Sequence, residues 1–267
     1  TPGPPPELPS KTAILVSSGA EDESVYLLYD GRRAAIDPSD PVTGRALRLD
    51  GTLPHRVSSA LLNVVPEAAP ISAPRIDGVG DPSLIRGFAV GSVLRVARAE
   101  TEEYYAVLLD GLQRIGRLTA DLIRFGDPHG TAGITTVAAD LVVSAPLVDA
   151  LPVASFPDQV PTLVGLDDSL CATWSTGRTT IGTGSMPPEG PAPVLLARAD
   201  GDGPGIDRVR IPGGRSVDVT VTGLNGDSAS TGRYLVTDAG VRFAVHDSAT
   251  ATALGLMDLA FAIAGFL

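Results

Sequence analysis

The sequence predicts an α+β protein of small repeated modules, each a three-strand meander followed by short helices, arranged around a central β-rich domain in an elongated molecule. Three observations lead to this prediction. The chain has 267 residues that are 43% hydrophobic but only 4% aromatic, so its cores must be mainly aliphatic. A hairpin pattern recurs three times, and short helix-compatible segments follow each copy.

The recurring pattern is an apolar run, a turn containing Asp and Gly, and a second run. It reads Tyr-Leu-Leu-Tyr-Asp-Gly-Arg-Arg at 26–33, Ala-Val-Leu-Leu-Asp-Gly-Leu-Gln at 106–113 and Tyr-Leu-Val-Thr-Asp-Ala-Gly-Val at 234–241. Glycine adopts positive φ without steric cost, which a tight hairpin turn requires. The predicted turn residues are Asp30, Gly31, Asp110, Gly111, Asp238 and Gly240. We expect these Asp side chains to bond local backbone groups rather than to catalyse.

Further strands and helices are predicted on both sides of each hairpin. First strands are expected at 12–17, 92–97 and 216–222, first helices at 43–50, 118–124 and 250–256, and second helices at 58–65 and 137–143. A unit of about 65 residues buries only about 60% of its unfolded surface, so each module should pack against its neighbours.

These repeats divide the chain into five parts. They are a proline-rich segment 1–10, a module 11–90, a second module 91–160, a central β-rich domain 161–214 and a third, shortened module 215–267. The central part matches no repeat and contains Cys171, Trp174 and stretches rich in glycine and proline. We expect short strands and loops there.

Composition excludes several classes of function. Asp and Glu number 31 against 20 Lys and Arg, giving a net charge of −11, so the chain should bind neither nucleic acid nor an anionic membrane surface. Lys11 is the only lysine, and Pro9 and Ser10 precede it instead of a glycine loop, which excludes a P-loop nucleotidase within this chain. The sequence contains no run of 18 apolar residues that could span a bilayer.

The isolated reactive residues do not form a recognisable catalytic pattern. His55, His129 and His246 belong to no metal-ligand spacing, so surface or turn roles are expected. Asp247 could orient the imidazole of His246, but neighbouring residues on a strand point to opposite faces. Cys171 is either a small buried apolar residue or half of a disulfide whose partner is missing. We therefore expect no catalytic, cofactor or metal site.

Several phrases of the sequence resemble a known family. They are Tyr-Leu-Leu-Tyr-Asp-Gly-Arg-Arg at 26–33, Val-Ser-Ser-Ala-Leu-Leu-Asn-Val-Val-Pro-Glu at 57–67, Pro-Arg-Ile-Asp-Gly-Val-Gly at 74–80, the hairpin at 104–115 and Leu-Cys-Ala-Thr-Trp at 170–174. The family is EccB, a membrane-anchored core component of the ESX, or type VII, secretion system of actinobacteria. The resemblance covers most of the chain in colinear order, and none of these phrases is catalytic.

The resemblance implies an extracytoplasmic (periplasmic) region behind one N-terminal transmembrane helix, with modules similar to the cell-wall-binding subunit of a phage lysin. It also implies a further N-terminal repeat and a second cysteine that pairs with the one matching Cys171. Both are absent from this sequence, so we expect a fragment in which the disulfide partner of Cys171 is missing. The expected partners are other ESX core membrane subunits and further EccB copies, with contact to the cell wall as an additional possibility.

Three functions follow as hypotheses. The first is a structural component that scaffolds the secretion complex on the extracytoplasmic side, without a cofactor. The second is binding of cell-wall glycan by the modules, which rests on analogy of fold and is weakened by the shortage of aromatic residues. The third is ATP hydrolysis, a label that members of the family sometimes carry, although the sequence offers no P-loop.

Overall fold

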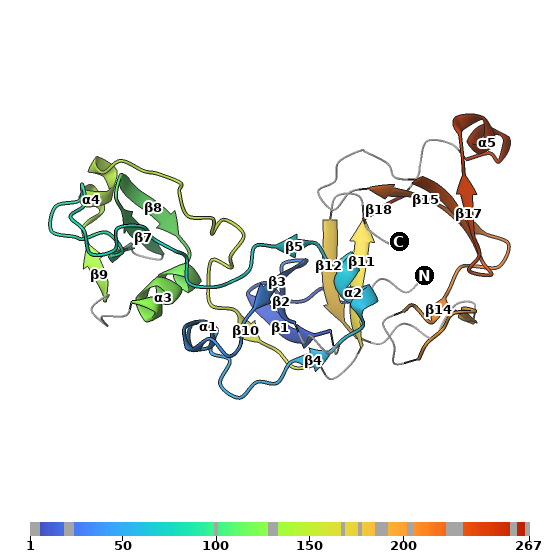
Figure 1. The fold of residues 1–267 in the computed structure, drawn as a ribbon, viewed down its shortest axis with the longest axis horizontal. Coiled ribbons are helices and arrows are strands. Elements are labelled where there is room, and N and C mark those ends of the chain that lie inside the picture. The colour runs from blue at the N-terminus through green and yellow to red at the C-terminus, as the bar shows by residue number, and fades with distance from the viewer. Residues whose placement is uncertain are drawn as a thin grey trace.

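Three meander sheets follow one another along the long axis of the molecule in the computed structural model (Figure 1). The structure describes residues 6–18, 24–98, 101–127, 133–166, 169–175, 178–184, 192–201, 205–222, 232–256 and 261–264. We call the three repeats modules A, B and C in chain order. Module A lies in the middle, with module B at one end and module C at the other, so the elongated repeat architecture predicted from the sequence is confirmed.

Module A contains five strands and two helices. They are β1 (Thr12–Ser17), β2 (Val25–Tyr29), β3 (Arg32–Ile36), α1 (Pro41–Leu47), β4 (His55–Arg56), α2 (Ser59–Val64) and β5 (Glu67–Ala68). The strands β1, β2 and β3 form the antiparallel meander, while β4 and β5 add parallel partners to β1 and β3. The apolar positions of β1 alternate between the two faces of this sheet, so both faces carry a core.

Module B repeats this arrangement. It contains β6 (Val93–Ala97), β7 (Glu102–Leu108), β8 (Gly111–Ile115), α3 (Arg117–Gly126), β9 (Ile134–Val137) and α4 (Ala139–Ser144). The order of the sheet is β8-β7-β6-β9, and an isolated parallel bridge joins Leu112 of β8 to Leu147. That bridge occupies the place that β5 takes in module A.

Module C contains β15 (Ser216–Thr222), β16 (Gly232–Thr237), β17 (Arg242–Val245), α5 (Ser248–Ala253) and β18 (Phe261–Ala264). The order of the sheet is β17-β16-β15-β18, with β18 parallel to β15. Asp247 is the N-cap residue of α5, and its carboxylate accepts a hydrogen bond from the Thr250 N–H at 2.7 Å. Asp247 therefore caps a helix, a role that sequence reasoning did not assign to it.

The remaining strands connect the modules. They are β10 (Thr162–Leu163), β11 (Leu170–Ser175), β12 (Arg178–Thr183), β13 (Val194–Leu195) and β14 (Arg208–Val209). The short β10 lies parallel to β1 and extends the sheet of module A. The β11–β12 hairpin, with helix α2, covers one face of that sheet, because Ile181 joins the core formed by Ile14, Val16 and Leu28.

The structure adds one recurring element that the sequence did not predict. After its helix, each module sends a short strand back to lie parallel to its first strand: β4 beside β1, β9 beside β6 and β18 beside β15. The two to four residues of these strands carry no alternating pattern long enough to indicate a strand. The predicted meanders and helices match the observed elements closely, with bounds shifted by a few residues.

Candidate functional site: the junction of modules A and B

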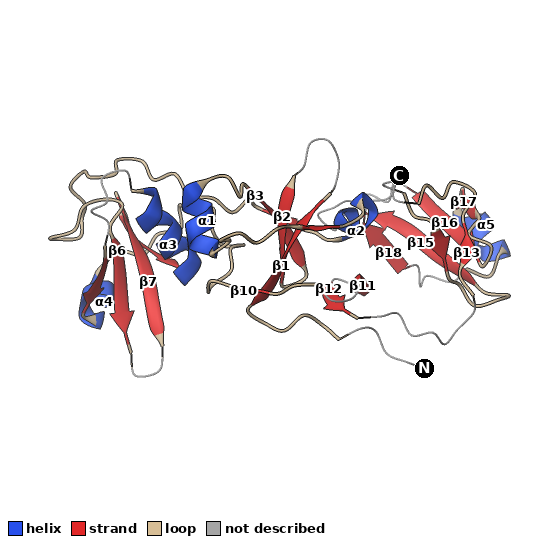
Figure 2. Ribbon diagram, turned by 90° about the horizontal axis from the view of Figure 1, so that it is seen from below, coloured by secondary structure: helices blue, strands red, loops and turns tan. Residues whose placement is uncertain are grey.

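The helix α3 belongs to the cores of two modules at once. Leu118 and Leu122, both fully buried, pack into the core of module A together with Leu47 of α1. On the other side of the same helix, Ala120 and Ile123 pack into the core of module B. Figure 2 shows α1 and α3 side by side between the two sheets. The junction is therefore a shared hydrophobic core rather than a flexible linker.

The sequence of α3 explains this double contact. Leu118 and Leu122 are four residues apart and share one face, and Ala120 and Ile123 are three apart on another. A helix that is apolar on more than one side must be covered on more than one side. Neither module alone can provide that cover, so the two modules fold against each other.

The segment that follows module B crosses the junction and fixes it further. Phe156 packs against the cores of both modules. The Tyr29 hydroxyl of module A donates a hydrogen bond to the Ser155 carbonyl at 2.7 Å, and the Arg117 N–H donates to the Asp158 carbonyl at 2.6 Å. Burial raises the pKa of Tyr29 to about 12, so its hydroxyl stays a donor across the physiological range.

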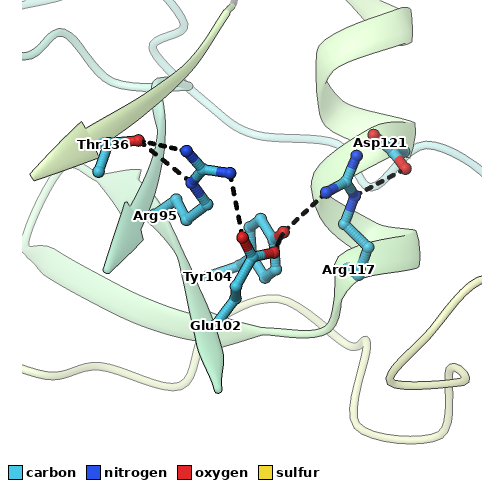
Figure 3. Close-up of polar contacts among 6 residues, drawn as sticks. All are labelled: Arg95, Glu102, Tyr104, Arg117, Asp121 and Thr136. Atoms are coloured by element: carbon cyan, nitrogen blue, oxygen red, sulfur yellow. Dashed lines mark hydrogen bonds and ion pairs between the residues drawn. The ribbon is translucent and has the colours of Figure 1, made fainter. Parts of the chain in front are cut away.

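A network of hydrogen-bonded charged and polar side chains connects the sheet of module B to α3 (Figure 3). Arg95 of β6 donates to the Thr136 hydroxyl at 2.7 Å and to the Glu102 carboxylate at 3.1 Å. Glu102 also accepts a hydrogen bond from the Tyr104 hydroxyl. Arg117 in turn donates to that hydroxyl at 2.7 Å. The hydrogen bond from Tyr104 is the largest cause that holds the pKa of Glu102 below its ordinary value.

The same network of side chains continues towards module A. Asp121 of α3, only 5% exposed, accepts a hydrogen bond from Arg117 at 3.0 Å and pairs with Arg124 at 3.1 Å. Arg124 and Arg45 of α1 both lie over the ring of Phe125, at 4.3 and 5.2 Å from its centre. Burial alone would lower the pKa of Arg117, but its hydrogen bonds to Asp121 and Tyr104 and its attraction to both groups together outweigh this and raise the pKa. The charges of the junction are thus compensated within the protein.

A groove of about 440 Å³ lies beside this network of side chains, between β7, β8 and the segment that crosses the junction. At one wall, Gln113 of β8 is buried, and its amide bonds to the segment 149–151. The polar side chains of the groove include Glu102, Glu103, Arg114, Arg117, Asp149 and Asp158. Within the described ranges, no group of three or more His, Cys, Asp or Glu residues is suited to hold a metal ion. The hydrogen bonds of Gln113 hold the segment 149–151 against β8.

The predicted turn residues lie at hairpin turns or next to them, where other segments approach closely. Asp30 and Gly31 both have positive φ, of 45° and 71°, and form the turn between β2 and β3. A Cβ on Gly31 would lie 1.9 Å from the carbonyl oxygen of Thr179 in β12. Asp110 lies in the turn of module B, and Gly111 is the first residue of β8.

The other two glycines show the same close approach. A Cβ on Gly111 would lie 2.3 Å from the Pro146 carbonyl oxygen, and one on Gly240 would lie 2.5 Å from a methyl carbon of Leu196. The Asp238 carboxylate accepts a hydrogen bond from the Gly214 N–H at 2.7 Å, a partner 24 residues away. The sequence indicated the turns, but no pattern in the sequence indicated these contacts with distant residues.

The remaining candidate residues lie apart from the junction. Cys171 is a free, half-buried cysteine in β11. His55 accepts a hydrogen bond from the Leu166 N–H at its Nε2, at 3.3 Å, and His246 follows β17. His129 and the side chain of Trp174 lie outside the described part of the structure.

Comparison with known families decides the classification. The model for the family described as "Type VII secretion system ESX-1, transport TM domain B" matches residues 3–264. This chain belongs to the EccB family. The resemblance found in the sequence phrases is thereby confirmed.

Other EccB proteins share its sequence and fold. The ESX-3 secretion system ATPase EccB3 of Mycolicibacterium smegmatis is 33% identical over 270 residues, covering 93% of this chain and 52% of the relative. The ESX-2 secretion system ATPase EccB2 of Mycobacterium tuberculosis is 30% identical over 255 residues, covering 88% and 52%. This chain therefore spans about half the length of the curated EccB relatives that it matches.

Solved structures agree with the fold. The EccB3 dimer from the ESX-3 core complex matches with a TM-score of 0.78 at 29% identity, over 97% of this chain and 69% of that chain. The periplasmic assembly from the ESX-5 inner membrane complex matches with a TM-score of 0.70 at 24% identity, over 98% and 68%. In the part of the chain that the structure describes, no helix combines the length and the apolar character needed to cross a bilayer.

Proposed function

We propose that this chain is a structural part of an ESX secretion complex and that it scaffolds the complex on the extracytoplasmic side of the cytoplasmic membrane. The shared core at the junction of modules A and B is the observation that supports this role most directly. Leu118 and Leu122 of α3 are fully buried in the core of the neighbouring module. Such a junction holds two modules at a fixed angle, as a scaffold requires.

The EccB relatives suggest the partners. One similar structure is an EccB3 dimer from the ESX-3 core complex, which supports a second EccB copy and other core subunits as partners of this protein. In the full-length protein, an N-terminal transmembrane helix would anchor the region to the membrane. We also propose that segments 11–90, 91–160 and 215–267 are the modules around a central region 161–214, and that Cys171 pairs with a cysteine outside this chain.

A secretion assay in a host that lacks its own copy of the protein tests the scaffold. Leu122→Asp places a charge in the shared core and should abolish both recovery of the membrane complex and secretion. Val143→Asp is the matched control, because Val143 is 82% exposed on α4 of the same module. Normal secretion by the Leu122→Asp protein, present at normal abundance, would contradict the proposal.

Catalysis by this chain is the competing function, since the curated relatives carry the word ATPase in their names. The measurement is phosphate release from ATP by the purified chain, repeated with a Lys11→Ala variant that removes its only lysine. Steady release that a point substitution abolishes would establish an enzyme. A sedimentation assay with insoluble cell wall separates the glycan-binding hypothesis, which requires the chain to be retained.

A further inference from the structure

One edge position can be compared in all three modules. The register of the hairpins places Arg33 opposite Leu28, Leu112 opposite Val107, and Arg242 opposite Val236. Arg33 lies over the ring of Tyr26 as Arg242 lies over the ring of Tyr234. Arg33, Leu112 and Arg242 are therefore equivalent residues on the third strand of each meander. That strand forms one side of the meander, and its outer backbone groups need a partner.

In modules A and B, a segment preceded by proline supplies that partner. The Arg33 N–H donates to the Pro66 carbonyl at 2.8 Å, and the Leu112 N–H donates to the Pro146 carbonyl at 2.8 Å. The next residues, Glu67 and Leu147, then pair in parallel with Arg33 and Leu112. The same backbone pattern therefore closes the edge in both modules.

The segment that pairs with the edge also covers the side chain of the edge residue. Leu112 is fully buried, and the side chain of Arg33 is 13% exposed and pairs with Glu67 at 2.9 Å. Arg242, in contrast, is exposed, and its neighbours Val241 and Phe243 are 47% and 54% exposed. Among the residues that the structure describes, β17 pairs with β16 only. Module C thus presents an open, apolar strand edge where the other two modules are closed.

We propose that the outer edge of β17 accepts an extended segment of the same protein, preceded by proline, that follows β18 and pairs with Arg242. The spacing supports this source. Glu67 follows His55 of β4 by twelve positions, and Leu147 follows the equivalent Thr135 of β9 by twelve positions.

The corresponding residue of β18 is Phe261, because it pairs with Val219 as His55 pairs with Val16 and Thr135 with Leu94. Twelve further residues lead to a position beyond Leu267. Curated relatives extend well beyond the length of this chain, which covers 52% of them. A segment of the same protein is therefore the occupant that fits both the edge and the spacing.

Thiol labelling tests the proposal. Arg242→Cys is introduced into a cysteine-free background, both in the chain of residues 1–267 and in the longer protein that continues past Leu267. We expect thiol labelling at position 242 to be at least about tenfold slower in the longer protein, because a paired edge opens only transiently. Val143→Cys, on the exposed face of α4, should label at the same rate in both proteins.

A deletion identifies the source of the protection. Removal of the eight residues centred twelve positions after Phe261 should restore fast labelling in the longer protein. Hydrogen exchange of the Arg242 amide, measured without substitution, should be slower in the longer protein and should become fast again after the deletion. Equal labelling in both proteins, protection that survives the deletion, or protection that appears only as protein concentration rises would each overturn the proposal. The last result would assign the edge to a second copy.

Discussion

The carbonyl oxygen of Thr179 lies where a side chain of residue 31 would have to begin, 1.9 Å from an ideal Cβ on Gly31. Gly31 is the tip of the first hairpin, and Thr179 belongs to β12, far along the chain. The turn glycine therefore does two things: it adopts a φ of 71°, and it lets the β11–β12 hairpin pack against module A.

Gly31→Ala should destabilise the protein more than Gly51→Ala. Both residues have a φ of 71°, but no atom lies within 4 Å of a Cβ at position 51. The backbone cost of about 1–2 kcal/mol is common to both substitutions, whereas overlap with Thr179 adds about 1–3 kcal/mol at position 31. Denaturant unfolding of the two variants measures the difference. Equal losses would show that β12 does not pack as closely as observed.

The core shared by modules A and B leads to a prediction about the stability of a Leu122 variant. Leu122→Ala should lower the free energy of unfolding by about 2–5 kcal/mol, because a fully buried leucine is removed between two modules. Leu147→Ala, at a residue that is 65% exposed, should stay within about 0.5 kcal/mol of the parent. Calorimetry provides a second readout, since loss of the junction should split one transition into two. A single unshifted transition for Leu122→Ala would contradict a shared core.

The sequence predicted the local elements well and the contacts between them poorly. The hairpins at Asp30 and Asp238 carry strong turn chemistry, and the first strands and helices follow clear apolar patterns. The short parallel strands, such as β4 at His55 and Arg56, carry no such pattern. Their pairing depends on residues nearly forty positions away, which one sequence cannot reveal.

One part of the junction could have been found from the sequence. The segment Arg117–Gly126 is apolar on two sides, at Leu118 and Leu122 and at Ala120 and Ile123. Such a helix requires cover from two partners. The identity of the second partner, α1 of module A, depends on three-dimensional packing and had no separate signal.

The cap of α1 predicts a pH dependence. Asp40 accepts hydrogen bonds from the Thr43 hydroxyl at 2.6 Å and from the Thr43 and Val42 N–H groups at 3.0 and 3.2 Å. The bond from the Thr43 hydroxyl is the main cause that holds the pKa of Asp40 below its ordinary value of 3.8. Because the folded pKa is the lower one, this stabilisation is present above pH 3.8 and is lost as pH falls through the folded value.

Asp40→Asn should therefore keep most of the stability at pH 7 and reduce the loss below pH 3.8, since Asn caps helices about as well as Asp. Asp40→Ala should cost about 0.5–2 kcal/mol at pH 7. Thermal unfolding between pH 2.5 and 7 compares the three proteins. An Asn variant with the acid sensitivity of the parent would show that this carboxylate does not contribute to it.

The hydrogen bonds of Gln113 lead to a prediction about how the segment 149–151 is held against β8. Its amide oxygen accepts hydrogen bonds from the N–H groups of Ala150 and Leu151 at 2.9 and 2.7 Å, and its nitrogen donates to the Leu151 carbonyl at 3.0 Å. Gln113→Met keeps the volume but leaves these backbone groups unpaired, at about 1–3 kcal/mol for each buried group. The amides of Ala150 and Leu151 should then exchange with solvent faster, as hydrogen exchange by mass spectrometry or NMR would detect.

Gln159→Met, at an exposed residue of the same groove, should leave that exchange unchanged. Unchanged exchange at Ala150 and Leu151 in the Gln113→Met protein would mean that Phe156 and the hydrophobic cores hold the segment without the amide.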